Sequence, residues 1–300
     1  MKRVAYIGGQ KMPSVGRQWG GTLATNYCFQ KAFENDPDWH IDLLARENIG
    51  SADDIKQFCV GADVVHLDDA GTCGTMYLAG LATPDVIGPI TRSPVKNYKG
   101  WDCPYPEHWF YRARVIRLNY AEERACPERV TLILHGVNTE LLQPVPNPKR
   151  KLILWAGAAQ RFAKNYELWQ QITSAPAPHG FEWCTLSSYR VCDYWDTLDH
   201  AAVLVNTSKY ESFCCAAFEA MAKGVPVIWR EGLQGAGVHE GAGLRVEYEP
   251  EAYREAIRYV LGNPSPHEIS ARMYVEGHCT LKHMRDSYAA VYEEVVRGLK

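Results

Sequence analysis

The sequence has 300 residues, of which 46% are hydrophobic and 22% are charged, and its formal net charge is −3. This length is enough for two domains of about 150 residues, each able to bury its own core. The weak negative charge argues against a globally basic nucleic-acid-binding protein, although it does not exclude local basic patches. No apolar run approaches the roughly 20 residues that span a bilayer, so no transmembrane segment is predicted.

The cysteines indicate a reducing compartment. There are 10 of them, none forms a C-x-x-C pair, and Cys59 and Cys184 lie within apolar runs. The short apolar segment near the N-terminus is typical of a first strand rather than of a signal peptide. We therefore expect reduced, mostly buried thiols and a cytoplasmic location.

Strands and helices alternate through the first part of the chain. Hydrophobic patterning predicts strands over residues 3–7, 40–45, 62–67, 114–119 and 129–134, with helices over 22–33 and 53–59. The loop after the first strand ends at Gly20 and Gly21, but its glycines do not form G-x-G-x-x-G. The fingerprint of a dinucleotide-binding loop is therefore absent.

His66 stands at the carboxyl end of the third predicted strand, where α/β proteins place ligand-binding residues. Asp68 and Asp69 follow shortly after it, and the three residues together suggest a metal site. Alternating strand residues face opposite sides of a sheet, however, so a single ion shared by all three is disfavoured. No metal is predicted.

Cationic and aromatic side chains are interleaved between residues 91 and 120. Cations mixed with flat rings suit an anionic or ring-bearing acceptor, which is a nucleic acid, a lipid head group or a sugar. The alternative is a packed loop whose aromatic side chains belong to the core. The acceptor-side candidates are Arg92, Lys96, Lys99, Trp101, Trp109 and Arg112.

A proline-rich linker separates the first domain from the second. Pro144, Pro146 and Pro148 mark it. Beyond the linker the predicted elements are strands over 151–155, 181–186, 201–205 and 225–229, and helices over 194–200, 216–222, 250–261, 269–277 and 281–299. The uninterrupted apolar run at 201–205 is typical of a strand in a parallel sheet that is covered on both faces.

Two carboxylates bracket the helix predicted at 216–222. Glu211 lies in the loop before it and Glu219 lies within it, with seven residues between them. A helix N-terminus at the strand ends of an α/β sheet binds phosphate, because unpaired N–H groups and the helix dipole point there. An ionised carboxylate accepts hydrogen bonds and can hold a vicinal diol. Phosphate together with hydroxyls indicates a nucleotide sugar; the alternative is that both are ordinary solvated glutamates.

The segment from Glu211 to Glu219, continued by Ala-Met-Ala-Lys-Gly-Val-Pro-Val at 220–227, resembles the E-x7-E motif of retaining glycosyltransferases of family 4. The resemblance implies an α/β fold of the GT-B type, with two Rossmann-like domains whose parallel sheets face each other across a cleft. It implies domains over 1–146 and 147–280, the second holding the donor. It also implies that the helix at 281–300 returns to the first domain.

The resemblance also implies a role for each site residue. Glu211 would contact the transferred sugar and Glu219 the ribose, while Arg161 and Lys164 match the cations that neutralise the departing diphosphate. The N–H groups around Phe213, Cys214 and Cys215 would assist, and Cys214 stands where the family commonly has Gly. The remaining candidates are His66 near the transferred sugar, Gly20 and Gly21 in the first loop, and Ser188 and Tyr189 near the base.

From this resemblance we expect a retaining hexosyl- or pentosyltransferase that moves a sugar from a nucleoside-diphosphate sugar, similar to UDP-glucose, to a hydroxyl of a glycan or lipid intermediate. No cofactor is expected, because the nucleotide sugar is a cosubstrate, and the resembled motif requires no metal. One alternative is a phage-type enzyme that glycosylates hydroxymethylated bases in DNA, which would require access to a flipped base. A second alternative is a non-catalytic protein that binds nucleotide sugars.

Overall fold

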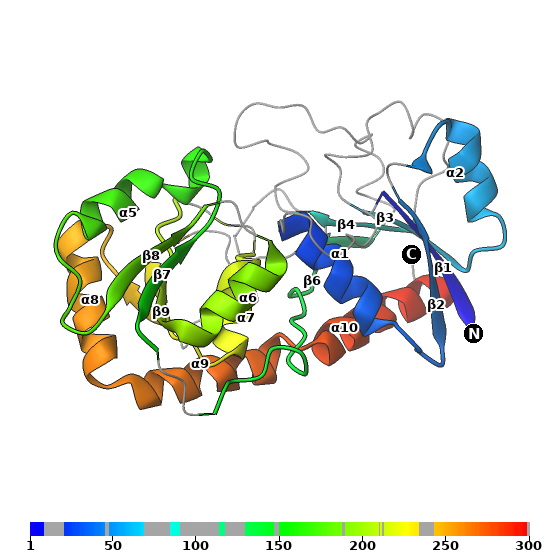
Figure 1. Cartoon of the computed structure of the whole chain (residues 1–300). Coiled ribbons are helices and arrows are strands. Elements are labelled where there is room, and N and C mark those ends of the chain that lie inside the picture. The colour runs from blue at the N-terminus through cyan, green and yellow to red at the C-terminus, as the bar shows by residue number, and fades with distance from the viewer. Residues whose placement is uncertain are drawn as a thin grey trace. The chain divides into compact units, whose positions relative to one another are not determined.

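The computed structural model describes residues 1–8, 21–45, 48–68, 85–90, 114–117, 130–146, 150–187, 190–209, 211, 213–233 and 243–298. The chain divides into two compact units (Figure 1). Unit 1 comprises Met1–Met12, Thr25–Gly136 and Leu281–Lys300, and unit 2 comprises Pro13–Ala24 and Val137–Thr280. The segment 137–280, which contains the predicted linker prolines, therefore lies wholly within unit 2.

Unit 1 is built on a parallel sheet with the strand order β2-β1-β3-β4-β5-β6. Its strands are β1 (Lys2–Ile7), β2 (Trp39–Leu44), β3 (Val64–Leu67), β4 (Val86–Ile90), β5 (Arg114–Arg117) and β6 (Val130–Leu132). Its helices are α1 (Gly21–Ala32), α2 (Ala52–Cys59) and α10 (Leu281–Val296).

Side chains alternate across this sheet as the period of two requires. On β1, Val4 and Tyr6 belong to the core that α1 and α10 cover. Figure 1 shows these two helices next to each other, and the ring of Phe29 in α1 lies 5.0 Å from that of Tyr288 in α10. One face of α10 is apolar and packs into this core, because Met284, Tyr288, Val291 and Val295 are all buried.

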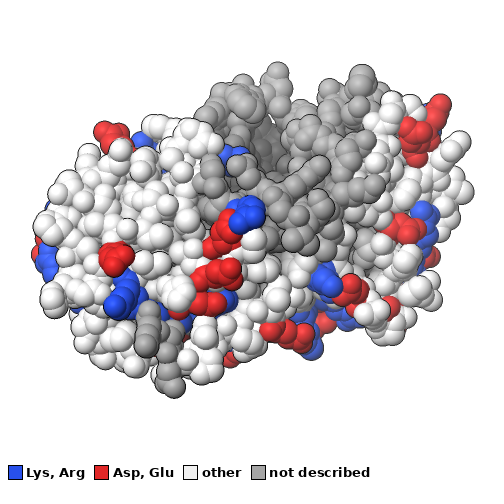
Figure 2. Space-filling model, viewed as in Figure 1, with Lys and Arg blue, Asp and Glu red and all other residues white. Residues whose placement is uncertain are grey.

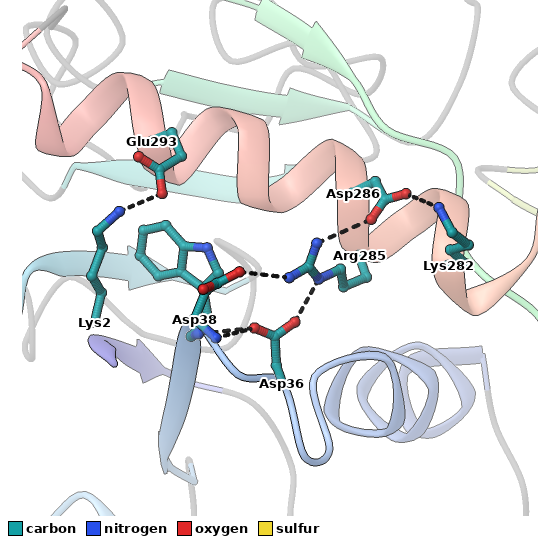
Figure 3. Close-up of polar contacts among 8 residues, drawn as sticks. Lys2, Asp36, Asp38, Lys282, Arg285, Asp286 and Glu293 are labelled. Atoms are coloured by element: carbon teal, nitrogen blue, oxygen red, sulfur yellow. Dashed lines mark hydrogen bonds and ion pairs between the residues drawn. The ribbon is translucent and has the colours of Figure 1, made fainter.

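Ion pairs fix α10 to the rest of unit 1 (Figure 3). Arg285 Nε lies 2.5 Å from Asp36 Oδ2, and its Nη2 lies 3.6 Å from Asp38. The other oxygen of Asp36 accepts the backbone N–H groups of Asp38 and Trp39, each at 2.9 Å. The Asp36 side chain is only 4% exposed, so this carboxylate holds both the turn before β2 and the helix.

Unit 2 is built on a parallel sheet with the strand order β11-β10-β9-β7-β8. Its strands are β7 (Leu152–Ala156), β8 (Glu182–Leu186), β9 (Ala201–Val205), β10 (Val227–Arg230) and β11 (Leu244–Val246). Its helices are η2 (Phe162–Lys164, a 3-10 turn), α5 (Tyr166–Thr173), α6 (Val191–His200), α7 (Cys215–Ala222), α8 (Pro250–Gly262) and α9 (Pro264–His278).

Helices cover both faces of this second sheet, as the apolar run of β9 predicted. Figure 1 shows α5 and α8 on one side and α6 and α7 on the other. Ile153 and Trp155 of β7 and Val203 of β9 pack against α5 and α8. On the α7 side, Phe218 lies 6.1 Å from the ring of Trp229 in β10. All five residues of β9 are buried, so unit 2 has two apolar layers around one central strand.

Two backbone features bear on the later argument. Val137 N donates to the carbonyl oxygen of Cys279 at 2.7 Å, and Val137 forms a parallel bridge with Thr280, so the two ends of the segment 137–280 lie side by side. Gly243, before β11, has φ +87, and a Cβ there would lie 2.3 Å from Val227 O and 2.8 Å from Trp229 Nε1. Only glycine fits at this position.

Candidate nucleotide-sugar site

The site predicted around Glu211 forms where two neighbouring strands of unit 2 end. β7 and β9 are adjacent and parallel, so their carboxyl ends meet at the same edge of the sheet. The loop after β7 leads into η2, and the loop after β9 leads into α7. The carboxyl edge of a parallel sheet is where α/β proteins bind ligands. The sheet therefore brings together two loops that are far apart in the sequence.

Hydrogen bonds join the two loops directly. Lys209 N donates to the carbonyl oxygen of Ala163 at 2.8 Å. The hydroxyl of Thr207 lies 2.9 Å from Lys164 O and 3.1 Å from Asn165 O, and it accepts the indole N–H of Trp155 at 2.9 Å. These contacts are buried or half-buried, so they fix one loop relative to the other.

Lys164 and Glu211, one from each loop, form an ion pair. Lys164 Nζ lies 2.5 Å from Glu211 Oε1, and the hydroxyl of Ser208 donates to the same oxygen at 2.6 Å. The Glu211 side chain is 9% exposed and that of Lys164 is 23% exposed. The structure thus places two of the predicted site residues in direct contact, with opposite charges and close to the surface.

The N-terminus of α7 follows Glu211 closely. Cys214 is its N-cap residue, with φ −76 and ψ 80, a conformation that does not require glycine. The thiol of Cys214 accepts the side-chain N–H of Asn206 at 3.1 Å, and Asn206 Oδ1 accepts Ser208 N at 2.8 Å. Burial, reinforced by the negative charge of Glu211, raises the pKa of this thiol to about 12. Cys214 therefore acts here as a neutral packing group.

Phe213 and Glu219 also lie at this helix. The ring of Phe213 stacks on Phe218 at a centroid distance of 4.3 Å, which anchors the residue before the N-cap in the core. Glu219 lies in the middle of α7 and is 5% exposed. Its predicted contact with a ribose stays a prediction.

Two guanidinium groups hold the C-terminal end of α7. Arg150 donates to the carbonyl oxygens of Lys223 and Gly224, at 2.8 and 2.7 Å. Arg272 of α9 donates to the carbonyl oxygen of Ala222. Cations at a helix C-terminus satisfy its last carbonyl groups and complement the dipole, so they stabilise the position of α7.

His66 lies in unit 1, in the core. Its ring is fully buried, and Nδ1 lies 2.7 Å from the hydroxyl of Tyr292 in α10. The rings of Tyr6 and Phe29 approach it edge-on, at 4.7 and 5.8 Å. These contacts place the His66 ring among core aromatics. Its predicted role near a transferred sugar stays a prediction.

Several other candidates fall outside the described residues. These are Gly20, Ser188, Tyr189, Arg92, Lys96, Lys99, Trp101, Trp109 and Arg112. Gly21 is the first residue of α1, Cys215 is the first residue of α7, and Arg161 is an exposed residue that precedes η2. The acceptor alternatives that depend on segment 91–120, including hydroxymethylated DNA, therefore stay predictions.

The sequence analysis did not identify Ser208 and Lys209 as site residues. In the structure Ser208 contacts Glu211, and Lys209 contacts the loop that carries Lys164. The polar run that ends β9 could have identified them, because residues just past the carboxyl end of a central strand lie at the ligand-binding edge of the sheet.

Within the described ranges, no group of three or more His, Cys, Asp or Glu side chains could hold a metal ion. No helix in the described part of the chain is long and apolar enough to cross a membrane.

The fold is that of GT-B glycosyltransferases. Sucrose-phosphate synthase from Thermosynechococcus elongatus superimposes with a TM-score of 0.73 at 16% identity, covering 99% of this chain and 100% of the other. HepE from Anabaena, in complex with UDP, gives 0.72 at 12% identity, covering 98% and 100%. AviGT4, a glycosyltransferase of avilamycin A biosynthesis, gives 0.68 at 15% identity, covering 99% of both chains. The predicted α/β fold with parallel sheets is confirmed.

Residues 131–263 match the family model described as Glycosyl transferases group 1. No curated protein matches the sequence. The matched segment contains Arg161, Lys164, Glu211 and Glu219, so the two contacting loops and α7 all lie within it. The prediction of an enzyme of the glycosyltransferase class is confirmed.

Proposed function

We propose that the protein is a retaining glycosyltransferase of the family 4 type, which transfers a sugar from a nucleoside-diphosphate sugar similar to UDP-glucose. The observation that carries this proposal is the Lys164–Glu211 pair beside the N-terminus of α7. A cation, a carboxylate and a helix N-terminus together match a ligand that has both phosphate and hydroxyl groups. HepE, which has a similar fold, binds UDP and UDP-glucose.

In the proposed reaction, the bond between the anomeric carbon of the sugar and the β-phosphate oxygen breaks, and both electrons leave with the diphosphate. Arg161 and Lys164 stabilise the charge that develops on this leaving group. Removing one such electrostatic contact from a transition state typically costs about 3–4 kcal/mol, or 10²–10³ in rate. The acceptor hydroxyl attacks on the face that the diphosphate leaves, and a phosphate oxygen takes its proton.

Glu211 has a different role in this proposal. Its carboxylate accepts hydrogen bonds from the hydroxyls of the donor sugar and stabilises the positively charged ring in the transition state. In the structure one oxygen of this carboxylate accepts hydrogen bonds from Lys164 and Ser208. When the donor binds, Lys164 and Glu211 therefore separate. The ammonium of Lys164 then binds phosphate, and Glu211 accepts hydrogen bonds from the sugar.

A thermal-shift panel of UDP, GDP, ADP and CDP sugars tests the donor class, because a ligand that binds only the folded state raises the melting temperature. We expect at least one of these donors to stabilise the protein. Donor hydrolysis by the purified chain should be measurable with chelator present and should be lost in Glu211→Ala. A protein that binds a donor without hydrolysing or transferring it would be the non-catalytic alternative. Activity that disappears with the chelator would refute metal independence.

A further inference from the structure

The two contacting loops of unit 2 carry more positive than negative charge. Arg161, Lys164 and Lys209 lie on them, and Glu211 is the half-buried carboxylate among these side chains. Lys164 is already paired with Glu211 at 2.5 Å. Within the described part of the chain, Arg161 and Lys209 have no ion-pair partner. The two loops therefore carry a local excess of cations.

The backbone of Lys209 is fixed from both sides. Its N–H donates to Ala163 O at 2.8 Å, and its carbonyl oxygen accepts Nη1 of Arg230 at 3.2 Å. Arg230 itself stacks on Tyr248, with its Cζ 4.5 Å from the ring centroid. The side chain of Lys209 therefore extends from a fixed backbone position, two residues before Glu211.

The ammonium group of Lys209 lies over an exposed aromatic ring. Its Nζ is 3.6 Å from the ring centroid of Phe162, and Phe162 is 70% exposed. Phe162 begins the 3-10 turn that ends at Lys164. A cation–π contact at an exposed site is weak. A charge-assisted hydrogen bond from an ammonium to a phosphate oxygen is stronger, so Lys209 can leave the ring when such an oxygen is within reach.

We propose that Lys209 is a third phosphate-binding cation of this site, held on Phe162 in the absence of ligand and transferred to the diphosphate group when a nucleoside diphosphate binds. The inference rests on the proposed function and adds to it. Lys164 must give up a carboxylate to bind phosphate, whereas Lys209 gives up only a ring face. Lys209 therefore provides the first contact, and Lys164 follows as Glu211 turns to the sugar.

The test is calorimetric titration with the nucleoside diphosphate that the wild-type protein binds, at low and high salt. Lys209→Met removes the charge and keeps the length of the side chain, and Lys209→Arg keeps the charge. Lys151→Met is the matched control, because Lys151 is an exposed lysine of unit 2 beside β7. We expect about tenfold weaker binding for Lys209→Met, which is the loss of one charged hydrogen bond. Lys209→Arg should remain within about threefold and the control should be unchanged.

Salt provides the readout that a purely structural role would not change. Binding by Lys209→Met should weaken less between about 20 and 200 mM salt than binding by the wild type, since fewer charges are screened. Equal affinity and equal salt dependence in the wild type and Lys209→Met would overturn the inference and leave the proposed function intact. If the wild type binds none of the UDP, GDP, ADP and CDP probes, the proposed function fails, and the inference fails with it.

Discussion

Replacing Glu211 by Gln should have opposite effects on nucleotide binding and on catalysis. The substitution keeps the shape of the side chain and removes the charge that holds Lys164 at 2.5 Å. The released ammonium is then available to phosphate. UDP lacks the transferred sugar that Glu211 is proposed to contact, so it should bind more tightly to Glu211→Gln than to the wild type.

The size of the effect follows from the exposure of the pair. Exposed ion pairs contribute about 0–1 kcal/mol, and the Glu211 side chain is only 9% exposed, which places this pair at the upper end. Releasing about 1 kcal/mol corresponds to a roughly fivefold lower dissociation constant for UDP. Donor hydrolysis should fall by about 10²–10³, because the amide cannot stabilise a positively charged sugar as the carboxylate does.

Titration calorimetry with UDP and a coupled assay of UDP release from the donor measure the two quantities. Glu182→Gln is a suitable control, since Glu182 is an exposed glutamate of β8 in the same unit. Weaker UDP binding by Glu211→Gln would refute the idea that Lys164 and Glu211 compete with phosphate. Unchanged hydrolysis would refute the assigned role of Glu211.

The other predictions concern stability and thiol reactivity. Arg285→Ala should lower the free energy of unfolding by about 2 kcal/mol, measured in urea, since it leaves the carboxylate of Asp36 without its cation. Burial alone would raise the pKa of Asp36, but Arg285 and two backbone N–H groups outweigh burial and lower that pKa. The wild type should therefore lose stability below about pH 4, where Asp36 becomes protonated. Arg285→Ala should lose less stability over the same pH range. Gly243→Ala should reduce the melting temperature sharply, because the added Cβ clashes with β10. The control Gly232→Ala, at φ +64 with nothing within 4 Å of the added Cβ, should cost only about 1–2 kcal/mol of stability. Equal losses of stability in the two variants would contradict the steric reasoning. Cys214 should resist alkylation by iodoacetamide at pH 8 in the folded protein, whereas Cys192, the exposed cysteine of α6, should react. Labelling of both cysteines at the same rate would show that the buried thiol is accessible.

Local pattern was sufficient to predict four of the five strands of the second sheet, β7 to β10, and also α7, whereas β11 and α5 were not predicted. The apolar run at 201–205 and the Gly224–Pro226 stop give β9, α7 and β10 with nearly the observed bounds. β4 was missed because it contains Pro89, which normally argues against a central strand, and its pairing with β5 is irregular between Ile87 and Ile90.

Tertiary contacts determined what the sequence could not show at the site. Glu211 and Lys164 were both predicted site residues, but their pairing depends on β7 and β9 being neighbours in the sheet. The contact between Lys209 and Phe162 also depends on β7 and β9 being adjacent. No sequence pattern distinguishes an exposed aromatic ring in a loop from one that belongs to a site. His66 was predicted at a strand end, where it lies, yet its burial depends on Tyr292, which comes from a helix at the other end of the sequence.

The side-by-side position of Val137 and Thr280 has a consequence for the order in which the protein folds during synthesis. The segment 137–280 begins and ends at neighbouring points, and its sheet and helices are complete once the chain has been made up to α9. Unit 1 is different, because its core includes residues of α10. Its sheet is made first but remains partly uncovered until α10 emerges from the ribosome, so unit 2 can fold before unit 1 is complete.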